Sequence, residues 1–180
     1  MKKRFVLGLL FFGLTFPGEL GAVGGGQQHK SAKNGKGQSQ ALQAIATIHG
    51  GTGPFAVAGY RMGARALKEI GATKGSFSLE VIHAAPAEVQ WSCMIDGLQA
   101  ATGTSLGKLN LRFERAPKEN MRSVVTDRAT GKQVVLVLKE SFLQKFLNTP
   151  VEKLSDVGKT VMNLPDDDIF LIQSSTTPHK

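Results

Sequence analysis

Two hydrophobic patterns follow one another along this chain, with helical spacing first and strand alternation afterwards. Apolar residues recur at helical spacing in residues 41–48 and again in residues 55–70. Residues 77–83 then alternate apolar and polar side chains as a strand does, and strand-like segments at 123–126 and 133–138 flank a glycine-containing turn. Helices that precede paired strands predict an α+β domain, in which helices pack on a mainly antiparallel sheet.

The same patterns predict shorter elements in the rest of the chain. We expect a helix over Trp91–Thr102, a strand over Leu109–Phe113, a short helix over Phe142–Leu147 and an edge strand over Phe170–Ile172. Residues 151–164 fit either a helix or a loop, and the pattern does not choose between them.

Composition supports a single domain that depends on a hydrophobic core. Hydrophobic residues make up 41% of the 180 residues, whereas Cys93 is the single cysteine and cannot form an intramolecular disulfide. The net charge is +8, but six of the 22 basic residues stand at positions 2–4 and 30–36. The remainder has no basic face with interleaved aromatic side chains, so we expect no nucleic-acid partner.

Residues 1–24 have the three-part layout of a secretory signal peptide. Basic residues at positions 2–4 precede an apolar run from Phe5 to Phe16, and Ala22-Val23-Gly24 offers a small-x-small cleavage site. As a helix the run would rise about 18 Å, which is short of the roughly 30 Å hydrocarbon core of a membrane. We therefore expect a cleavable signal, a periplasmic or secreted protein and no stable membrane span. An uncleaved amphipathic anchor is the alternative.

A basic segment separates this signal from the part that should fold. Residues 25–40 are rich in glycine, glutamine and lysine and show no apolar periodicity, which predicts a flexible linker. The folded domain is then expected over residues 41–175.

Two ordered motifs in the folded part carry a family resemblance. The first reads His-Gly-Gly-Thr-Gly-Pro-Phe from His49 and continues as Gly-Tyr-Arg-Met-Gly from Gly59. The second reads Cys-Met-Ile-Asp-Gly-Leu-Gln from Cys93 and Thr-Gly-Thr-Ser-Leu-Gly-Lys-Leu-Asn-Leu from Thr102. With the ending Leu-Pro-Asp-Asp-Asp-Ile-Phe from Leu164, they resemble the FmdE-like family of formylmethanofuran dehydrogenase components over about two-thirds of the chain.

The resemblance implies a metal site, from which this chain departs at three positions. Gly51, Gly53 and Thr104 stand where the family has a histidine and two cysteines. The motif is therefore degenerate, and a scaffold that has lost its metal is one of the two interpretations that the sequence leaves open.

Four residues remain as candidate metal ligands. The motifs retain His49, Cys93 and Asp96, and His83 at the end of a predicted strand is an independent candidate. Imidazole, thiolate and carboxylate groups bind zinc and similar divalent transition metals. Each residue also has a structural interpretation: Cys93 as a buried thiol, Asp96 as a cap of a nearby turn and His83 as a hydrogen-bonded strand histidine.

The other polar residues of the motifs are candidates for holding a small ligand. Arg61 and Lys108 could bind an anionic group, with Gln99 and Asn110 beside them, although Arg61 could equally pair with a core carboxylate such as Glu88 or Asp96. We expect these residues to line a cleft between the His49 turn and the turn over residues 103–108.

Three functions are compatible with these residues. The first is an exported domain that binds a metal ion or a small ligand in that cleft. The second is an accessory or structural component with a decayed site, for which a homodimer is a candidate assembly. The third is a metal- or thiol-dependent enzyme, so the sequence leaves open whether the chain catalyses a reaction. The one-carbon chemistry for which the family is named is not expected of an exported chain.

Overall fold

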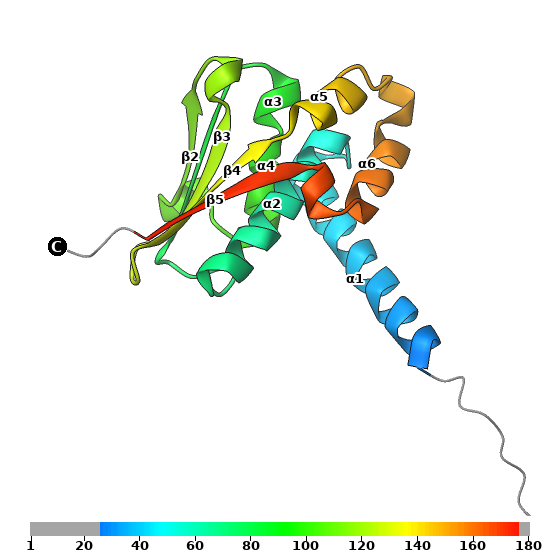
Figure 1. Ribbon diagram of the computed structural model, residues 1–180, viewed down its shortest axis with the longest axis horizontal. Coiled ribbons are helices and arrows are strands. Elements are labelled where there is room, and N and C mark those ends of the chain that lie inside the picture. The colour runs from blue at the N-terminus through cyan, green and yellow to red at the C-terminus, as the bar shows by residue number, and fades with distance from the viewer. Residues whose placement is uncertain (1–25, 177–180) are drawn as a thin grey trace, which may run out of the picture.

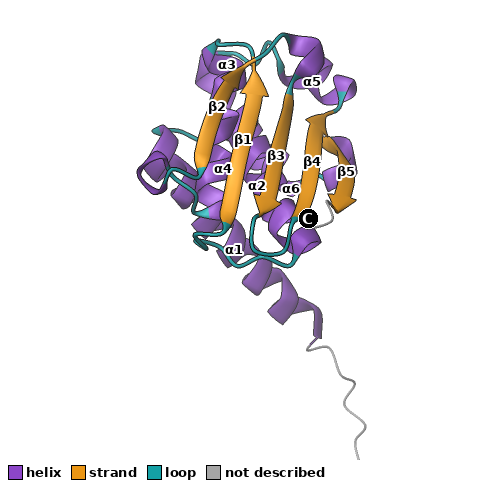
Figure 2. Ribbon diagram, turned by 90° about the vertical axis from the view of Figure 1, so that its left-hand side faces the viewer, coloured by secondary structure: helices purple, strands orange, loops and turns teal. Residues whose placement is uncertain are grey.

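The structure is a computed structural model that describes residues 26–176 of the chain, and the side chains of residues 36–173. A five-stranded sheet forms one layer and the helices pack against one of its faces, which is the α+β architecture predicted from the order of the patterns (Figures 1 and 2). Figure 2 looks onto the other face of the sheet, which no helix covers in that view.

The sheet is mainly antiparallel, with one parallel pair. Its strands are β1 (Leu79–Ala85), β2 (Leu111–Arg115), β3 (Arg122–Asp127), β4 (Lys132–Leu138) and β5 (Phe170–Thr176), in the spatial order β2-β1-β3-β4-β5. β1 runs parallel to β2 and antiparallel to β3, and β3, β4 and β5 are joined in antiparallel pairs. The expected hairpin over β3 and β4 and the expected last edge strand are both confirmed.

The hairpin between β3 and β4 closes through a residue that satisfies the turn. The carboxylate of Asp127 accepts from the backbone N–H of Ala129 at 3.1 Å and from the hydroxyl of Thr130 at 2.9 Å. Gly131, with a φ of 72°, supplies the left-handed conformation that completes the turn. Hydrogen bonds to its carboxylate, the largest contribution coming from Ser78, lower the pKa of Asp127.

Helix α2 (Pro54–Ile70) follows the sequence prediction closely. Proline occupies the start of the helix, where a missing N–H costs nothing, and Gly71 ends it in the left-handed conformation with its N–H bonded to the carbonyl of Leu67. The helix buries ten of its residues, so it lies at the centre of the core between the sheet and the other helices.

The helix expected over Trp91–Thr102 is divided into two. α3 (Val89–Ser92) ends and α4 (Met94–Thr102) begins at Cys93, whose backbone N–H still bonds to the carbonyl of Val89. The N–H of Asp96 then bonds to the carbonyl of Cys93, three residues earlier. The chain therefore changes its hydrogen-bonding spacing at Cys93, a local change that side-chain periodicity does not record.

Two helices follow the sheet's central strands. α5 (Glu140–Phe146) matches the predicted short helix, and α6 (Leu154–Asn163) assigns a helix to the segment that the pattern left open. Phe142, Phe146, Val161 and Met162 from these helices are buried in the common core. Short 3-10 turns occur at Leu106–Lys108, Lys118–Asn120, Val151–Lys153 and Asp166–Asp168.

The first helix is longer than the sequence predicts. α1 spans Gly26–His49, so helix replaces the irregular linker expected over residues 25–40. Only its last part packs on the domain, through Ala41 and Ile45, which explains why the apolar pattern begins there. The predicted signal peptide, residues 1–24, lies outside the described residues. Within the described part, no helix has the length and apolar character needed to cross a membrane.

Candidate ligand pocket at His49 and Cys93

His49 and Asp96, which lie far apart in the sequence, form a hydrogen-bonded pair. His49 is the last residue of α1 and Asp96 lies in the first turn of α4. Their Nδ1 and Oδ2 atoms are 2.8 Å apart, and both side chains are partly exposed. Because a carboxylate only accepts hydrogen bonds, Nδ1 is the donor, which leaves Nε2 as the ring nitrogen available to another group.

Cys93 lies beside this pair as a neutral thiol. Its Sγ donates to the carbonyl of Gln90 at 3.4 Å. Burial, aided by the negative charge of Asp96, raises the pKa of the Cys93 thiol from 9.0 to about 12. At neutral pH the free protein therefore presents a thiol, which is a far weaker nucleophile than a thiolate.

One pocket joins His49 and Cys93. Its volume is about 500 Å³, within the range of small-molecule sites. Apolar side chains from α2, α5 and α6 form much of its wall, and Glu88, Gln90 and Thr149 add polar groups. The lining residues are His49, Gly53, Pro54, Phe55, Glu88, Val89, Gln90, Cys93, Phe146, Leu147, Thr149 and Leu154.

Glycines allow the helices around the pocket to approach at backbone distance. A Cβ placed on Gly97 of α4 would lie 1.9 Å from the carbonyl oxygen of Ala56 in α2, and one on Gly59 would lie 2.1 Å from that of Met94. A Cβ on Gly158 of α6 would lie 1.7 Å from the carbonyl oxygen of Thr52. The motif glycines therefore bring the starts of α2 and α4 and the His49 turn together.

His83 does not belong to this pocket. It is fully buried in β1, with Nδ1 3.0 Å from the hydroxyl of Ser123 and Nε2 donating to the carbonyl of Trp91 at 3.1 Å. Both ring nitrogens are therefore occupied. Burial lowers the pKa of His83 to about 4, so the ring is neutral at neutral pH. The arrangement matches the structural interpretation of this residue.

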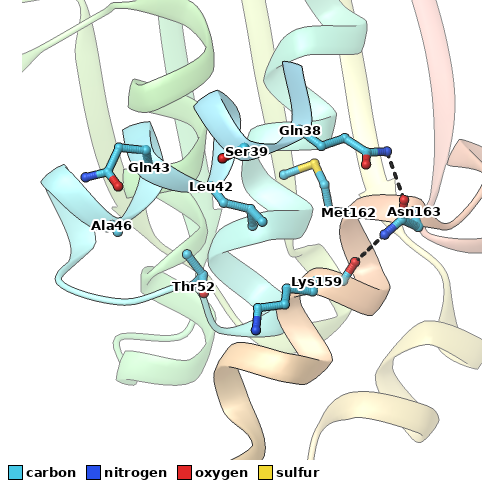
Figure 3. A pocket seen from close by; sticks show the side chains of 9 residues that line it. All are labelled: Gln38, Ser39, Leu42, Gln43, Ala46, Thr52, Lys159, Met162 and Asn163. Carbon is cyan, nitrogen blue, oxygen red and sulfur yellow. Dashed lines mark hydrogen bonds between the residues drawn. The ribbon is translucent and has the colours of Figure 1, made fainter. Parts of the chain in front are cut away.

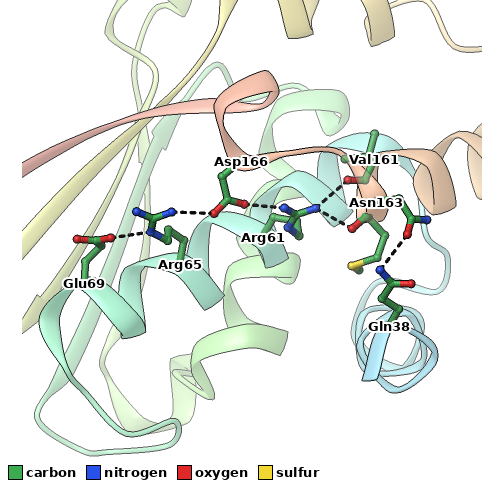
Figure 4. A network of polar contacts seen from close by, with 8 residues as sticks. Gln38, Arg61, Arg65, Glu69, Val161, Asn163 and Asp166 are labelled. Carbon is green, nitrogen blue, oxygen red and sulfur yellow. Dashed lines mark hydrogen bonds and ion pairs between the residues drawn. The ribbon is translucent and has the colours of Figure 1, made fainter. Parts of the chain in front are cut away.

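Arg61 is held by the C-terminal end of α6 (Figure 4). Its guanidinium donates to the carbonyls of Val161 at 3.2 Å and Met162 at 2.7 Å, and pairs with Asp166 at 2.6 Å. Arg65 also reaches Asp166, at 3.2 Å. The carboxylate that pairs with Arg61 is therefore Asp166, and not Glu88 or Asp96 as the sequence suggested.

Lys108 and Asn110 stabilise the second glycine turn from within. The ammonium of Lys108 donates to the carbonyls of Gly103 and Gly75. The side-chain carbonyl of Asn110 accepts from the N–H of Ser105 at 3.0 Å, while its Nδ2 is buried and has no hydrogen-bond partner among the described residues. These contacts agree with a role in shaping the turn.

The two motif turns lie at opposite ends of α4. The N-terminal end carries Asp96, which contacts His49, whereas Thr102 at the C-terminal end leads into the Gly103 turn. The cleft expected between the turns is therefore not formed, and the pocket lies at the His49 end alone. Gln99 lies between the two ends on α4 and Thr104 is buried against Thr102, so neither lines this pocket.

The residues present do not complete a closed metal site. Among the described residues, no group of three or more His, Cys, Asp or Glu side chains is arranged to hold a metal ion. His49 and Cys93 share the pocket, but a zinc site needs three or four protein ligands. Gly51 and Gly53, which the family resemblance places in the ligand set, contribute no donor side chain.

Several pocket residues could not be found from the sequence. Phe146, Leu147 and Leu154 come from α5 and the start of α6, about a hundred residues after His49. They look like ordinary apolar core residues, and only the tertiary fold brings them to the motifs. Glu88 also gave no signal of its own, and it accepts from Trp91 Nε1 at 3.3 Å.

A second hollow lies between α1 and α6 (Figure 3). It measures about 470 Å³ and is lined by Gln38, Ser39, Leu42, Gln43, Ala46, Thr52, Lys159, Met162 and Asn163. Gln38 donates to Asn163 at 2.8 Å across it. The hollow includes none of the candidate site residues, so it serves as a reference surface for tests of the His49 pocket.

The fold and the site define an α+β domain with a mainly apolar pocket and a histidine–aspartate pair at its edge. The family model described as FmdE, molybdenum formylmethanofuran dehydrogenase operon, matches residues 48–171, and the chain belongs to this family. The match includes both glycine-containing motifs and the whole sheet up to the first residues of β5.

A solved structure has the same fold. It is the crystal structure of an FmdE-like protein of tungsten formylmethanofuran dehydrogenase from Syntrophus aciditrophicus. The similarity has a TM-score of 0.53 at 17% identity and covers 78% of this chain and 73% of that one. No curated protein matches the chain.

Proposed function

We propose that this FmdE-like domain binds a small organic ligand in the pocket beside His49 and Cys93. The observation that carries the proposal is the His49–Asp96 pair at the edge of a mainly apolar pocket of about 500 Å³. An apolar cavity with a few well-placed polar groups is the usual form of a small-molecule site. The ligand should therefore combine an apolar body with a polar group that hydrogen-bonds to His49.

The state of the side chains favours binding over catalysis by the thiol. Asp96 holds the His49 ring in one orientation, which reduces the ordering cost of ligand binding. The Cys93 thiol, with its raised pKa, lacks the depressed pKa of a catalytic cysteine. A thiol-dependent enzyme is therefore the weaker alternative.

A dye with an apolar body and an anionic group tests the pocket directly. We expect 8-anilinonaphthalene-1-sulfonate to bind saturably, with a rise in its fluorescence. Leu154→Trp should abolish this binding, because the indole would fill the pocket that Leu154 lines. Native mass spectrometry of protein purified from the envelope fraction would show whether a natural ligand remains bound.

Val151→Trp is the matched control for this test. Val151 lies three residues before Leu154 but is 82% exposed and does not line the pocket. This variant should bind the dye as the wild type does. Equal binding by wild type and Leu154→Trp would contradict the proposal, since the dye would then be bound elsewhere.

Metal binding is the second candidate, and one observation favours it. A carboxylate that orients a histidine through its second ring nitrogen is also the arrangement found behind metal-binding histidines. His49 Nε2 and Cys93 would then hold the ion together with ligands from outside the described residues. Elemental analysis of the purified protein tests this: about one equivalent of zinc that is lost in Cys93→Ala would support it.

Export to the periplasm or the medium is a further part of the proposal. It rests on the basic start, apolar run and small-x-small site of residues 1–24. Cell fractionation followed by N-terminal sequencing should find the mature protein outside the cytoplasm, beginning near Gly25. A full-length protein in the cytoplasm would contradict it.

A further inference from the structure

Strand β2 forms one edge of the sheet and is open on its outer side. Leu111–Arg115 pair with β1 alone, and no strand follows β2 in the sheet order. Arg112, Glu114 and Arg115 are exposed, and the Arg112 side chain retains 51% of its exposure despite its pair with Glu80 at 3.2 Å. An open edge presents main-chain N–H and C=O groups that another strand can use.

The hydrogen bonds at both ends of the β1–β2 ladder show which groups of β2 are free. The carbonyl of Asn110 accepts from Val81 N–H at 2.9 Å, and the N–H of Ala116 donates to the carbonyl of Ala85 at 3.0 Å. Residues that bond to one neighbouring strand alternate along a ladder, so Arg112 and Glu114 also face β1. The main-chain groups of Leu111, Phe113 and Arg115 therefore point to the open edge, with Phe113 in the middle.

This edge is complementary to a second copy of itself. If the two strands run antiparallel with Phe113 opposite Phe113, Leu111 lies opposite Arg115 and Arg112 lies opposite Glu114. The outward main-chain groups then form about six hydrogen bonds between the copies. Two Arg112–Glu114 pairs of opposite charge lie on the same face of the joined sheet, where directly opposite charges attract.

The charge pattern separates this edge from a merely protected one. Proteins often protect open edges with like charges, which would repel a second copy. Here the order Leu-Arg-Phe-Glu-Arg places opposite charges across the central phenylalanine, so the same charges that keep other strands away attract this one.

An exposed apolar side chain lies at the end of the same line. Leu109 precedes β2 with 83% exposure and a φ of 54°, an unusual conformation for leucine. In the antiparallel pairing it lies opposite Pro117 of the second copy. The pairing therefore gives a partner to an apolar residue that the single chain leaves in water.

We infer that β2 is the dimerisation strand of this protein, through which two copies join their sheets edge to edge about Phe113. The inference does not depend on the proposed ligand, because β2 contributes no residue to the His49 pocket. Sedimentation velocity of the purified protein over a range of concentrations should show a monomer–dimer equilibrium.

A charge exchange tests the register. Glu114→Arg would place two arginines opposite each other at both pairs and should weaken dimerisation about tenfold. The double variant Arg112→Glu/Glu114→Arg should restore the dimer, because the pairs return with their charges exchanged. Thermal unfolding should accompany both, since Arg112→Glu also removes the pair with Glu80.

A proline variant tests the main-chain hydrogen bonds. Arg115→Pro removes an N–H that points to the open edge, so the β1–β2 ladder should survive while the dimer is lost. If this variant fails to fold, the charge exchange still decides the question. A wild-type protein that stays monomeric at all concentrations, or a dimer that is equally strong in Glu114→Arg, would overturn the inference.

Discussion

Gly97 of α4 lies directly against the backbone of Ala56 in α2, with no side chain between the two helices. Replacing Gly97 with alanine would place a Cβ 1.9 Å from the Ala56 carbonyl oxygen, so the helices must separate. We expect Gly97→Ala to lower the free energy of unfolding by about 3 kcal/mol, as overpacking does in cores. Chemical denaturation measures this. Gly107→Ala is the control, because nothing lies within 4 Å of a Cβ there.

Cys93 should react slowly with thiol reagents in the native protein. Because burial and the charge of Asp96 raise its pKa to about 12, little thiolate exists at neutral pH, and the iodoacetamide rate should keep rising with pH beyond 9. Asp96→Asn removes the neighbouring charge, so it should speed labelling at a fixed pH. A labelling rate that levels off near the ordinary pKa of 9.0 would show that the thiol is not perturbed.

The buried histidine should make the fold sensitive to mild acid. In the unfolded chain His83 takes up a proton near pH 6.5, whereas in the folded protein it does so only near pH 4. Its contribution is therefore fully present above pH 6.5 and is lost as the pH falls from 6.5 to 4, by roughly 3 kcal/mol in total. The measurement is the free energy of unfolding against pH.

His83→Gln isolates this contribution from that of the carboxylates. Glutamine keeps hydrogen-bonding capacity but does not titrate, so the slope of stability against pH between 6.5 and 4 should become shallower than in wild type. Parallel curves for the two proteins would mean that His83 is not the residue responsible.

Arg61 should prove structural, with no part in ligand binding. Arg61→Met removes the hydrogen bonds to Val161 and Met162 and the pair with Asp166, and it should cost about 2 kcal/mol of stability. Dye binding to the folded variant should remain unchanged, because Arg61 does not line the His49 pocket. Lys159→Ala, which breaks only an exposed pair with Asp156, should be nearly neutral in unfolding experiments.

Side chains at two glycine positions should create a metal site. A Cβ on Gly51 meets nothing within 4 Å, and one on Gly53 meets only Leu154, at 3.8 Å. Neither position has a positive φ, so larger residues fit without backbone strain. We expect Gly51→His/Gly53→Cys to bind zinc more tightly than wild type, as measured by competition with a chromogenic chelator. No gain in affinity would argue against this end of the pocket as the metal position.

The sequence predicted the regular elements best where the pattern depends on the residues alone. α2 with its proline start and glycine end, and the β3–β4 hairpin with its Asp-to-Gly turn, are determined by local chemistry. The division of α3 and α4 at Cys93 was missed, because a change of hydrogen-bonding spacing leaves side-chain periodicity intact. The helical start of α1 was missed because its residues have no apolar face to reveal it.

The candidate site was predictable only in part. His49, Cys93 and Asp96 were identified from their motifs, and the structure brings them to one end of α4. Arg61 and Lys108 have the same chemistry as ligand-binding residues, and nothing local shows that their partners are carbonyls of α6 and of the Gly103 turn. The partner of a polar side chain depends on tertiary contacts, which composition and spacing do not contain.

The contact between Gly97 and Ala56 also separates two properties of this domain. Because main-chain atoms set the distance between α2 and α4, the frame of the pocket does not depend on the side chains that line it. Positions 51 and 53 can therefore change their chemical character while the helices stay in place. Members of the family could exchange one kind of bound molecule for another at little cost in folding.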